Sequence, residues 1–223
     1  MGIKTIAMAA ALCCLGLTIS AGAASAQMGG MGMARNLPGF GGIFNPTVGL
    51  GADYDMTTSK GENMKMSMAI VGKDTINGQP GYWMQLTINS PKTQGPMYMK
   101  MLSVKTGDQV MTSRMIMGIN GQAYQMPDQM VNMNQKPRDA NIATSNDVVG
   151  TESVTVPAGT FSTTHYRSKD GASDFWIAND AGPWGMVKMQ SKDGTTMVLT
   201  KTYTDAKDML PGPAQPFPGM GQR

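Results

Sequence analysis

His165 is the only histidine of the chain, and histidine is the side chain whose ordinary pKa best suits a general base near neutral pH. It lies in the segment Ser162-Thr163-Thr164-His165-Tyr166-Arg167, which is typical of a strand. Both cysteines, Cys13 and Cys14, lie close to the N-terminus, so Ser-His-Asp and Cys-His arrangements would all depend on His165. We therefore expect a hydrogen-bonded structural histidine, and we predict no catalytic residues and no enzymatic activity.

The sequence also offers few side chains suited to binding a metal ion or a phosphate group. A zinc site would need several His or Cys side chains. Asp53 and Asp55 share the polar face of a predicted strand and could form a weak cation site, but a solvated face is the simpler interpretation. The Gly-rich stretch 29–42 lacks the lysine and the strand–turn–helix setting of a phosphate-binding loop. The sequence therefore predicts no cofactor and no metal-binding residues.

Methionine is the unusual component, with 24 residues in a chain of 223. Three interpretations follow. Methionine could replace branched aliphatic residues as flexible core filler, or it could line a deformable surface for apolar ligands. In the third, thioethers bind Cu(I) through Met-x-Met at residues 64–68, 97–101 and 115–117, or Met28, Met31 and Met33 scavenge oxidants. The predicted ligand-lining residues are Met66, Met68, Met84, Met99, Met101, Met115 and Met117.

These methionines belong to segments that alternate apolar and polar residues with a period of two, which indicates half-buried strands. Such segments recur from residue 48 to residue 204, and they are separated by turn signals such as Asn77-Gly78 and residues 179–183. Residues 127–134 are the best helical candidate. We predict a mainly β fold: an open, strongly curved antiparallel sheet, a half-barrel of about eleven strands, with one or two short helices against its concave face.

The two ends of the chain differ from this pattern. Residues 1–26 are typical of a secretory signal peptide, with an apolar stretch from Ile6 to Ile19 and Ala24-Ser25-Ala26 before the predicted cleavage site. Residues 27–46 form a Gly/Met-rich leader and residues 209–223 a Pro-rich tail, both expected to be flexible. This leaves one domain at 47–208. We predict a periplasmic or secreted protein with no membrane span after cleavage of the signal peptide.

Two stretches carry a family resemblance. The run Gly150-Thr151-Glu152-Ser153-Val154-Thr155-Val156-Pro157-Ala158-Gly159-Thr160-Phe161, followed by Phe175-Trp176-Ile177 and Met186-Val187-Lys188, resembles a family of unknown function in bacterial secreted proteins. The resemblance covers about residues 47–205. The family is similar in fold to the periplasmic lipoprotein carriers LolA and LolB, which implies a curved antiparallel sheet around a short helix and an apolar concavity. It implies no catalytic residues, and a shared fold does not by itself imply lipoprotein transfer.

Together these features predict a non-enzymatic exported protein that binds an apolar ligand, such as a lipid or acyl chain, in a Met-lined concavity. The alternatives are Cu(I) handling through the Met-x-Met strands and a structural envelope module with a filled concavity and no small ligand. The net charge of +3 and the absence of a basic run argue against nucleic acid as a partner. The oligomeric state is left open.

Overall fold

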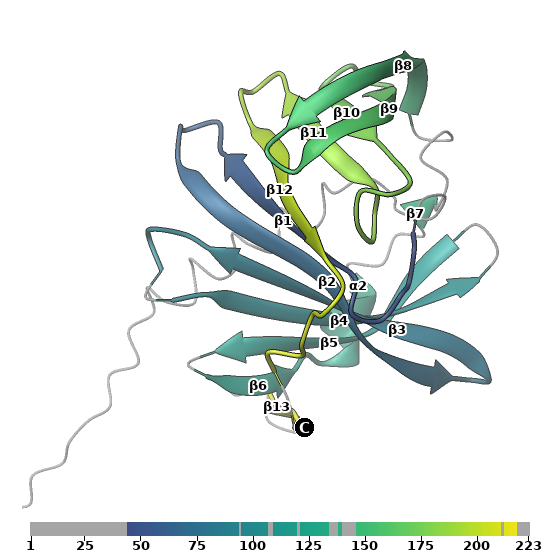
Figure 1. The fold of residues 1–223 in the computed structure, drawn as a ribbon. Coiled ribbons are helices and arrows are strands. Elements are labelled where there is room, and N and C mark those ends of the chain that lie inside the picture. Colours follow the sequence, from purple (N-terminus) through teal and green to yellow (C-terminus); the bar gives the residue numbers. More distant parts are fainter. Residues whose placement is uncertain are drawn as a thin grey trace, which may run out of the picture. The chain divides into compact units, whose positions relative to one another are not determined.

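A computed structural model describes residues 44–93, 95–106, 109–119, 121–133, 138–139, 146–210 and 212–217. Most of these residues form strands (Figure 1). The elements are β1 (Gly51–Thr57), β2 (Asn63–Ile76), β3 (Gln79–Asn89), β4 (Met97–Thr106), β5 (Gln109–Ile119), β6 (Gln122–Gln125), α2 (Asp128–Met133), β7 (Arg138–Asp139), β8 (Asn146–Val156), β9 (Gly159–Ser168), β10 (Ser173–Ile177), β11 (Met186–Ser191), β12 (Thr196–Tyr203) and β13 (Gln215–Pro216).

These strands form one open sheet in the order β13-β6-β5-β4-β3-β2-β1-β12-β11-β10-β9-β8, and β7 pairs separately with β5. From β1 to β6 and from β8 to β12, consecutive strands are antiparallel neighbours because their connections are short. At Asn77-Gly78, for example, φ is +50° and +77°, the conformation of a tight hairpin turn. The predicted mainly β, open sheet is confirmed. It differs from the prediction in two respects: the described residues contain thirteen strands, and β13 pairs with β6 in parallel.

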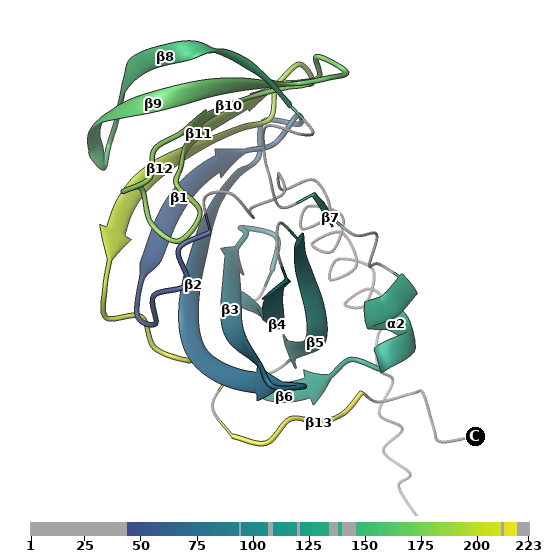
Figure 2. The ribbon, with the colours of Figure 1, turned by 90° about the vertical axis from the view of Figure 1, so that its right-hand side faces the viewer.

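The sheet bends strongly along its strands, and Figure 2 shows β2 and β3 curving around one side. Register shifts interrupt five of the strand pairings. They lie between Asp53 and Tyr54, Ile70 and Gly72, Leu102 and Ser103, Val148 and Gly150, and Trp176 and Ile177. Because an extra residue in one strand increases its local twist and bend, these irregularities account for much of the curvature.

The helix predicted at residues 127–134 is present as α2, directly after Pro127. It packs against β5, where Val131 is 2% exposed. Figure 2 shows α2 on the concave side of the sheet, as expected. One or two short helices were predicted, and α2 is the one helix within the described ranges.

The packed domain extends beyond the predicted limits of 47–208. Phe44 is buried, and the backbone N–H of Asn45 donates to Pro183 O at 2.8 Å. At the other end Leu210 is buried and β13 joins the sheet, although both lie in the segment predicted to be a flexible tail. The predicted signal peptide and residues 27–43 of the predicted leader lie outside the described residues. No helix in the described ranges is long and apolar enough to cross a membrane.

Leu210 and Met209 offer a matched test of this C-terminal packing. Leu210 is 5% exposed and its neighbour Met209 is 53% exposed. Leu210→Ala should lower the free energy of unfolding by about 2–4 kcal/mol because it leaves a cavity on the sheet. Met209→Ala should change the same quantity by less than about 0.5 kcal/mol. Urea denaturation of the two variants would measure both, and equal effects would show that Leu210 is not part of the core.

Candidate functional site

The seven predicted ligand-lining methionines share one face of the sheet. Directly paired residues of neighbouring strands point to the same side, and alternate residues within a strand do likewise. Three rows follow from the register: Met66–Ile88, Met68–Leu86–Met99–Met117 and Ile70–Met84–Met101–Met115. This is the concave face, because α2 packs on β5 there and the C-terminal segment crosses the other side (Figure 2). The sequence therefore placed these methionines on a common surface without fixing their neighbours.

Burial along this face is uneven. Five of the seven methionines are at most 8% exposed, and two are half-buried. The buried ones are Met66, Met68, Met84, Met99 and Met117, and the half-buried ones are Met101 and Met115. The third row therefore runs from the closed interior at Met84 toward solvent at β4 and β5.

The loop between β10 and β11 covers the central part of the concave face. Ala181 is fully buried and Trp184 is 2% exposed, with its ring centroid 6.2 Å from that of Phe44. Gly182 has φ +75°, and a Cβ there would lie 2.8 Å from the Cβ of Ala52, so only glycine fits. The loop of residues 178–185, which contains the predicted turn at 179–183, is thus a plug that fills the concavity at β1. Its signal in the sequence was the compact apolar run Ala181-Gly182-Pro183-Trp184.

Two polar atoms are buried on this apolar face without a hydrogen-bond partner among the described residues: Tyr54 Oη and Ser103 Oγ. Both side chains are 1% exposed. Burial is the main reason that the pKa of Tyr54 is raised, and the nearby Asp53 carboxylate adds to it. Tyr54 and Ser103 belong to different rows of the sheet, on β1 and β4 respectively. Ser103 lies two residues from Met101 and on the same face as Met101.

The second cluster gathers around His165 on β9. Its Nε2 donates to Asp174 Oδ1 at 2.7 Å, and its Nδ1 lies 3.2 Å from Glu152 Oε1. The imidazole stacks on Trp176 with ring centroids 4.5 Å apart, and Trp176 Nε1 donates to the same Glu152 oxygen at 2.7 Å. Arg167 Nε donates to Asp174 Oδ1 at 2.9 Å. Strands β8, β9 and β10 are thereby tied together by side chains as well as by the backbone.

This arrangement gives His165 a positioning role in the sheet. Both ring nitrogens face carboxylate oxygens, which only accept, so both bonds form together when the ring is an imidazolium. Although burial raises the pKa of Asp174, the hydrogen bonds from His165 and Arg167 lower it by more, so its pKa lies below the ordinary value of 3.8. The sequence predicted a hydrogen-bonded structural histidine on a strand, but it gave no signal that Glu152 and Asp174 would be the partners.

The two aspartates considered for a cation site are engaged elsewhere. Asp55 pairs with Lys65 at 3.3 Å. Asp53 lies beside Tyr203, where burial and then the Asp53 carboxylate raise the pKa of the phenol to about 12. Within the described ranges, no group of three or more His, Cys, Asp or Glu side chains is arranged to hold a metal ion.

Methionines from four adjacent strands also form one row of the concave face, in the order Met64, Met56, Met197 and Met189. They are 8%, 9%, 1% and 9% exposed. Met-x-Met spacing places two sulfurs on one face of a single strand, about 7 Å apart, and the fold adds partners from neighbouring strands. Met56, Met189 and Met197 were not among the predicted site residues, because strand order is not encoded in local spacing.

Comparison with known proteins gives limited similarity. No family model matches the chain, and no curated protein matches it. A solved structure from Bacteroides fragilis, described as an exported protein with a YmcC-like fold, is 15% identical with a TM-score of 0.37, covering 71% of this chain and 98% of that one. A protein from Parabacteroides distasonis, described as a lipoprotein, is 15% identical with a TM-score of 0.37, covering 75% and 100%. Scores of this size carry no argument about the chain, so the resemblance to LolA and LolB stays a prediction.

The His165 cluster predicts a specific acid sensitivity. The pKa of Asp174 is lower in the folded chain than in the unfolded one. Asp174 therefore stabilises the fold at pH values above its ordinary pKa of 3.8. That contribution is lost as the pH falls through 3.8 toward the folded pKa. Wild type should therefore be more stable than Asp174→Asn at neutral pH, with the difference shrinking in acid. Urea midpoints measured from about pH 6 to about pH 2 test this.

Asp147→Asn, which removes an exposed carboxylate from β8, serves as the control. Its difference from wild type should change far less over the same pH range. A stability difference for Asp174→Asn that stays constant in acid would contradict the assigned role of the His165 and Arg167 hydrogen bonds.

Proposed function

We propose that this is a non-enzymatic exported protein that binds an apolar chain at the β4–β5 end of its concave face. The observation that carries the proposal is the gradient of burial along one row: Met84 is 8% exposed, whereas Met101 and Met115 are half-buried. The plug closes the face at β1, so a ligand would lie along the methionines beyond it. Unbranched thioether side chains adapt to chains of different shape at little cost.

The chemistry of this surface favours a ligand with a long apolar part and one polar group. Each methylene group transferred from water to such a surface contributes about 0.8 kcal/mol. Ser103 Oγ, buried two residues from Met101, can donate to or accept from a carboxyl, hydroxyl or ester group. A buried hydroxyl gains most from a ligand that completes its hydrogen bonding. A fatty acid or an acyl chain of a lipid meets both requirements.

Two further features support the remaining parts of the proposal. The ring nitrogens of the sole histidine lie 2.7 Å and 3.2 Å from carboxylate oxygens of Asp174 and Glu152, which supports a structural role for this side chain. The N-terminal sequence, with its apolar stretch and Ala24-Ser25-Ala26, supports export.

Cu(I) handling is a second candidate, and the row of Met64, Met56, Met197 and Met189 is the observation that favours it. Thioethers are soft ligands that select Cu(I), and the four side chains occupy adjacent strands. Their low exposure argues for a core role instead. Competition against a Cu(I) chelator, with Met56→Leu and Met197→Leu as variants, separates the two roles. Unchanged competition in these variants would remove this row as a metal site.

A filled structural module with no small ligand is the third candidate, and the plug of residues 178–185 supports it. It differs from the main proposal in one respect that can be measured. The module would be isolated without a bound lipid and would not take one up.

Binding of a fluorescent fatty acid tests the main proposal. Met115→Arg places a charge on the half-buried end of the row and should weaken binding by about tenfold or more, since an unpaired charge there opposes an apolar chain. Met111→Arg, on the same strand but the opposite face, is 46% exposed before substitution and should bind as wild type does. Native mass spectrometry of protein purified from its own envelope provides an independent measurement.

A wild-type protein that is isolated free of lipid and also fails to bind the fluorescent fatty acid would contradict the proposal. Equal loss of binding in Met115→Arg and Met111→Arg would contradict the location of the site.

A further inference from the structure

The concave face changes from apolar to polar next to the methionine row that ends at Met115. The following row of the register has a polar side chain on each of four adjacent strands, β2 to β5: Lys73, Tyr82, Ser103 and Thr112. Directly paired residues share a face, so these side chains lie on the same side of the sheet as the methionines. These four residues are the polar row. It places one ammonium group and three hydroxyl groups beside an apolar surface.

Two register shifts bring the outer members of the polar row to the concave face. In β2, even-numbered residues up to Ile70 face inward, so an uninterrupted strand would turn Lys73 outward. The shift between Ile70 and Gly72 adds one residue to β2 and turns Lys73 inward. A shift in the pairing of β4 with β5 likewise brings Thr112 opposite Ser103. Such bulges are frequent next to functional sites, where they change the direction of a side chain.

Ser103 gives the polar row a hydroxyl group that is ready for a ligand. Its Oγ has no hydrogen-bond partner among the described residues, and the residue is 1% exposed. Tyr82 and Thr112 on either side of it are half-buried, as are Met101 and Met115 in the next row. A buried hydroxyl without a partner is unfavourable, and an oxygen of a ligand can supply the missing hydrogen bond.

Lys73 gives the polar row its positive charge. Its side chain is exposed, and Nζ lies 5.7 Å from the centroid of the Tyr82 ring. Lys65, Lys92 and Lys100 each pair with a carboxylate, whereas no ion pair involves Lys73 within the part of the chain that the structure describes. The ammonium group can therefore bind an anion that lies along the polar row.

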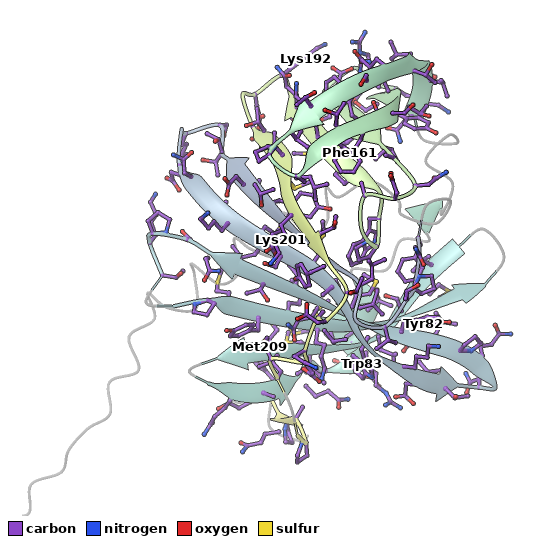
Figure 3. All side chains as sticks on the ribbon, in the orientation of Figure 1. Tyr82, Trp83, Phe161, Lys192, Lys201 and Met209 are labelled. Carbon is purple, nitrogen blue, oxygen red and sulfur yellow. The ribbon has the colours of Figure 1, made fainter. Side chains whose placement is uncertain are left out.

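Aromatic side chains connect the plug to the polar row. Phe44 contacts both Trp184 of the plug and Tyr82, with ring centroids 6.2 Å apart in each pair. Tyr82 and its neighbour Trp83, both labelled in Figure 3, lie on opposite faces of β3. Trp83 belongs to the convex face, where Lys100 Nζ lies 5.0 Å from its ring centroid. The half-buried methionines are therefore bordered by the plug on one side and by polar groups on another.

We propose that the ligand of the concave face is a single-chain amphiphile whose anionic head group, a carboxylate or a phosphate, binds Lys73 and Ser103. This inference rests on the proposed function, since it places the head group of the apolar chain that lies on Met101 and Met115. Ser103 follows Met101 by two residues on the same face of β4, a distance of about 7 Å. Ammonium and hydroxyl groups both donate to an anionic oxygen, and hydrogen bonds between charged groups are the stronger ones. A neutral ester would satisfy Ser103 but would leave Lys73 without a counter-charge.

Calorimetric titration of the full chain at about pH 8, where a carboxyl group is ionised, tests this. The ligands are a fatty acid, a monoalkyl phosphate and a monoacylglycerol of equal chain length, each below its critical micelle concentration. Wild type should bind an anionic ligand about fivefold more tightly than the neutral one, as expected for a partly solvated ion pair. Lys73→Met keeps an apolar stem without the charge and should abolish this preference. The anion that binds more tightly identifies the head group as a carboxylate or a phosphate.

Lys65→Met is the matched control, because it changes the net charge equally on the same strand but faces outward. It should retain the preference of wild type, and added salt should reduce that preference by screening Lys73. Equal affinity of wild type for the charged and neutral ligands, or a preference that survives in Lys73→Met, would overturn this inference and leave the proposed function standing. A wild type that binds none of the three ligands would overturn the proposed function, and this inference with it.

Discussion

The need to cover one apolar face of an open sheet governs this structure. A strand sequence that alternates methionine with polar residues builds such a face but does not supply a second layer to cover it. Here the sheet bends, and the loop of residues 178–185 fills the concavity with Trp184 and Ala181. Gly182 allows the loop to approach Ala52, so a single glycine decides how closely the plug packs.

The proposed ligand surface lies where burial along the same face falls. At β4 and β5 the methionines become half-buried, and the buried hydroxyl of Ser103 lies close by. The same flexible side chain therefore serves as core filler beneath the plug and as a candidate ligand surface beyond it, because the thioether tolerates both environments. Burial, and not residue type, separates the two roles.

The convex face and the β8–β10 region show the complementary solution for charged groups. Lys100 and His165 are both largely buried. Lys100 is held by the carboxylate of Asp208, which is distant in the chain, and His165 lies between carboxylates of the neighbouring strands. Such pairs stabilise chiefly by avoiding an unpaired charge, and they therefore restrict which segments can occupy the site. On the convex face, Lys100 holds the C-terminal segment through Asp208 and the carbonyl oxygen of Leu210. No local pattern around Lys100 or His165 indicated these partners.

The sequence by itself determined the mainly β fold, most of the strands, the α2 helix and the common face of the seven methionines. These features follow from the alternation of apolar and polar residues and from turn residues, which both act over a few neighbouring positions. Asn77-Gly78, for example, forms its turn whatever the place of the hairpin in the sheet. Only the tertiary structure decided that a predicted turn is a plug, that Leu210 and β13 belong to the packed domain, and that Met64, Met56, Met197 and Met189 form one row. Those outcomes depend on strand order and on contacts between residues more than a hundred positions apart, as for Lys100 and Asp208, which local spacing does not encode.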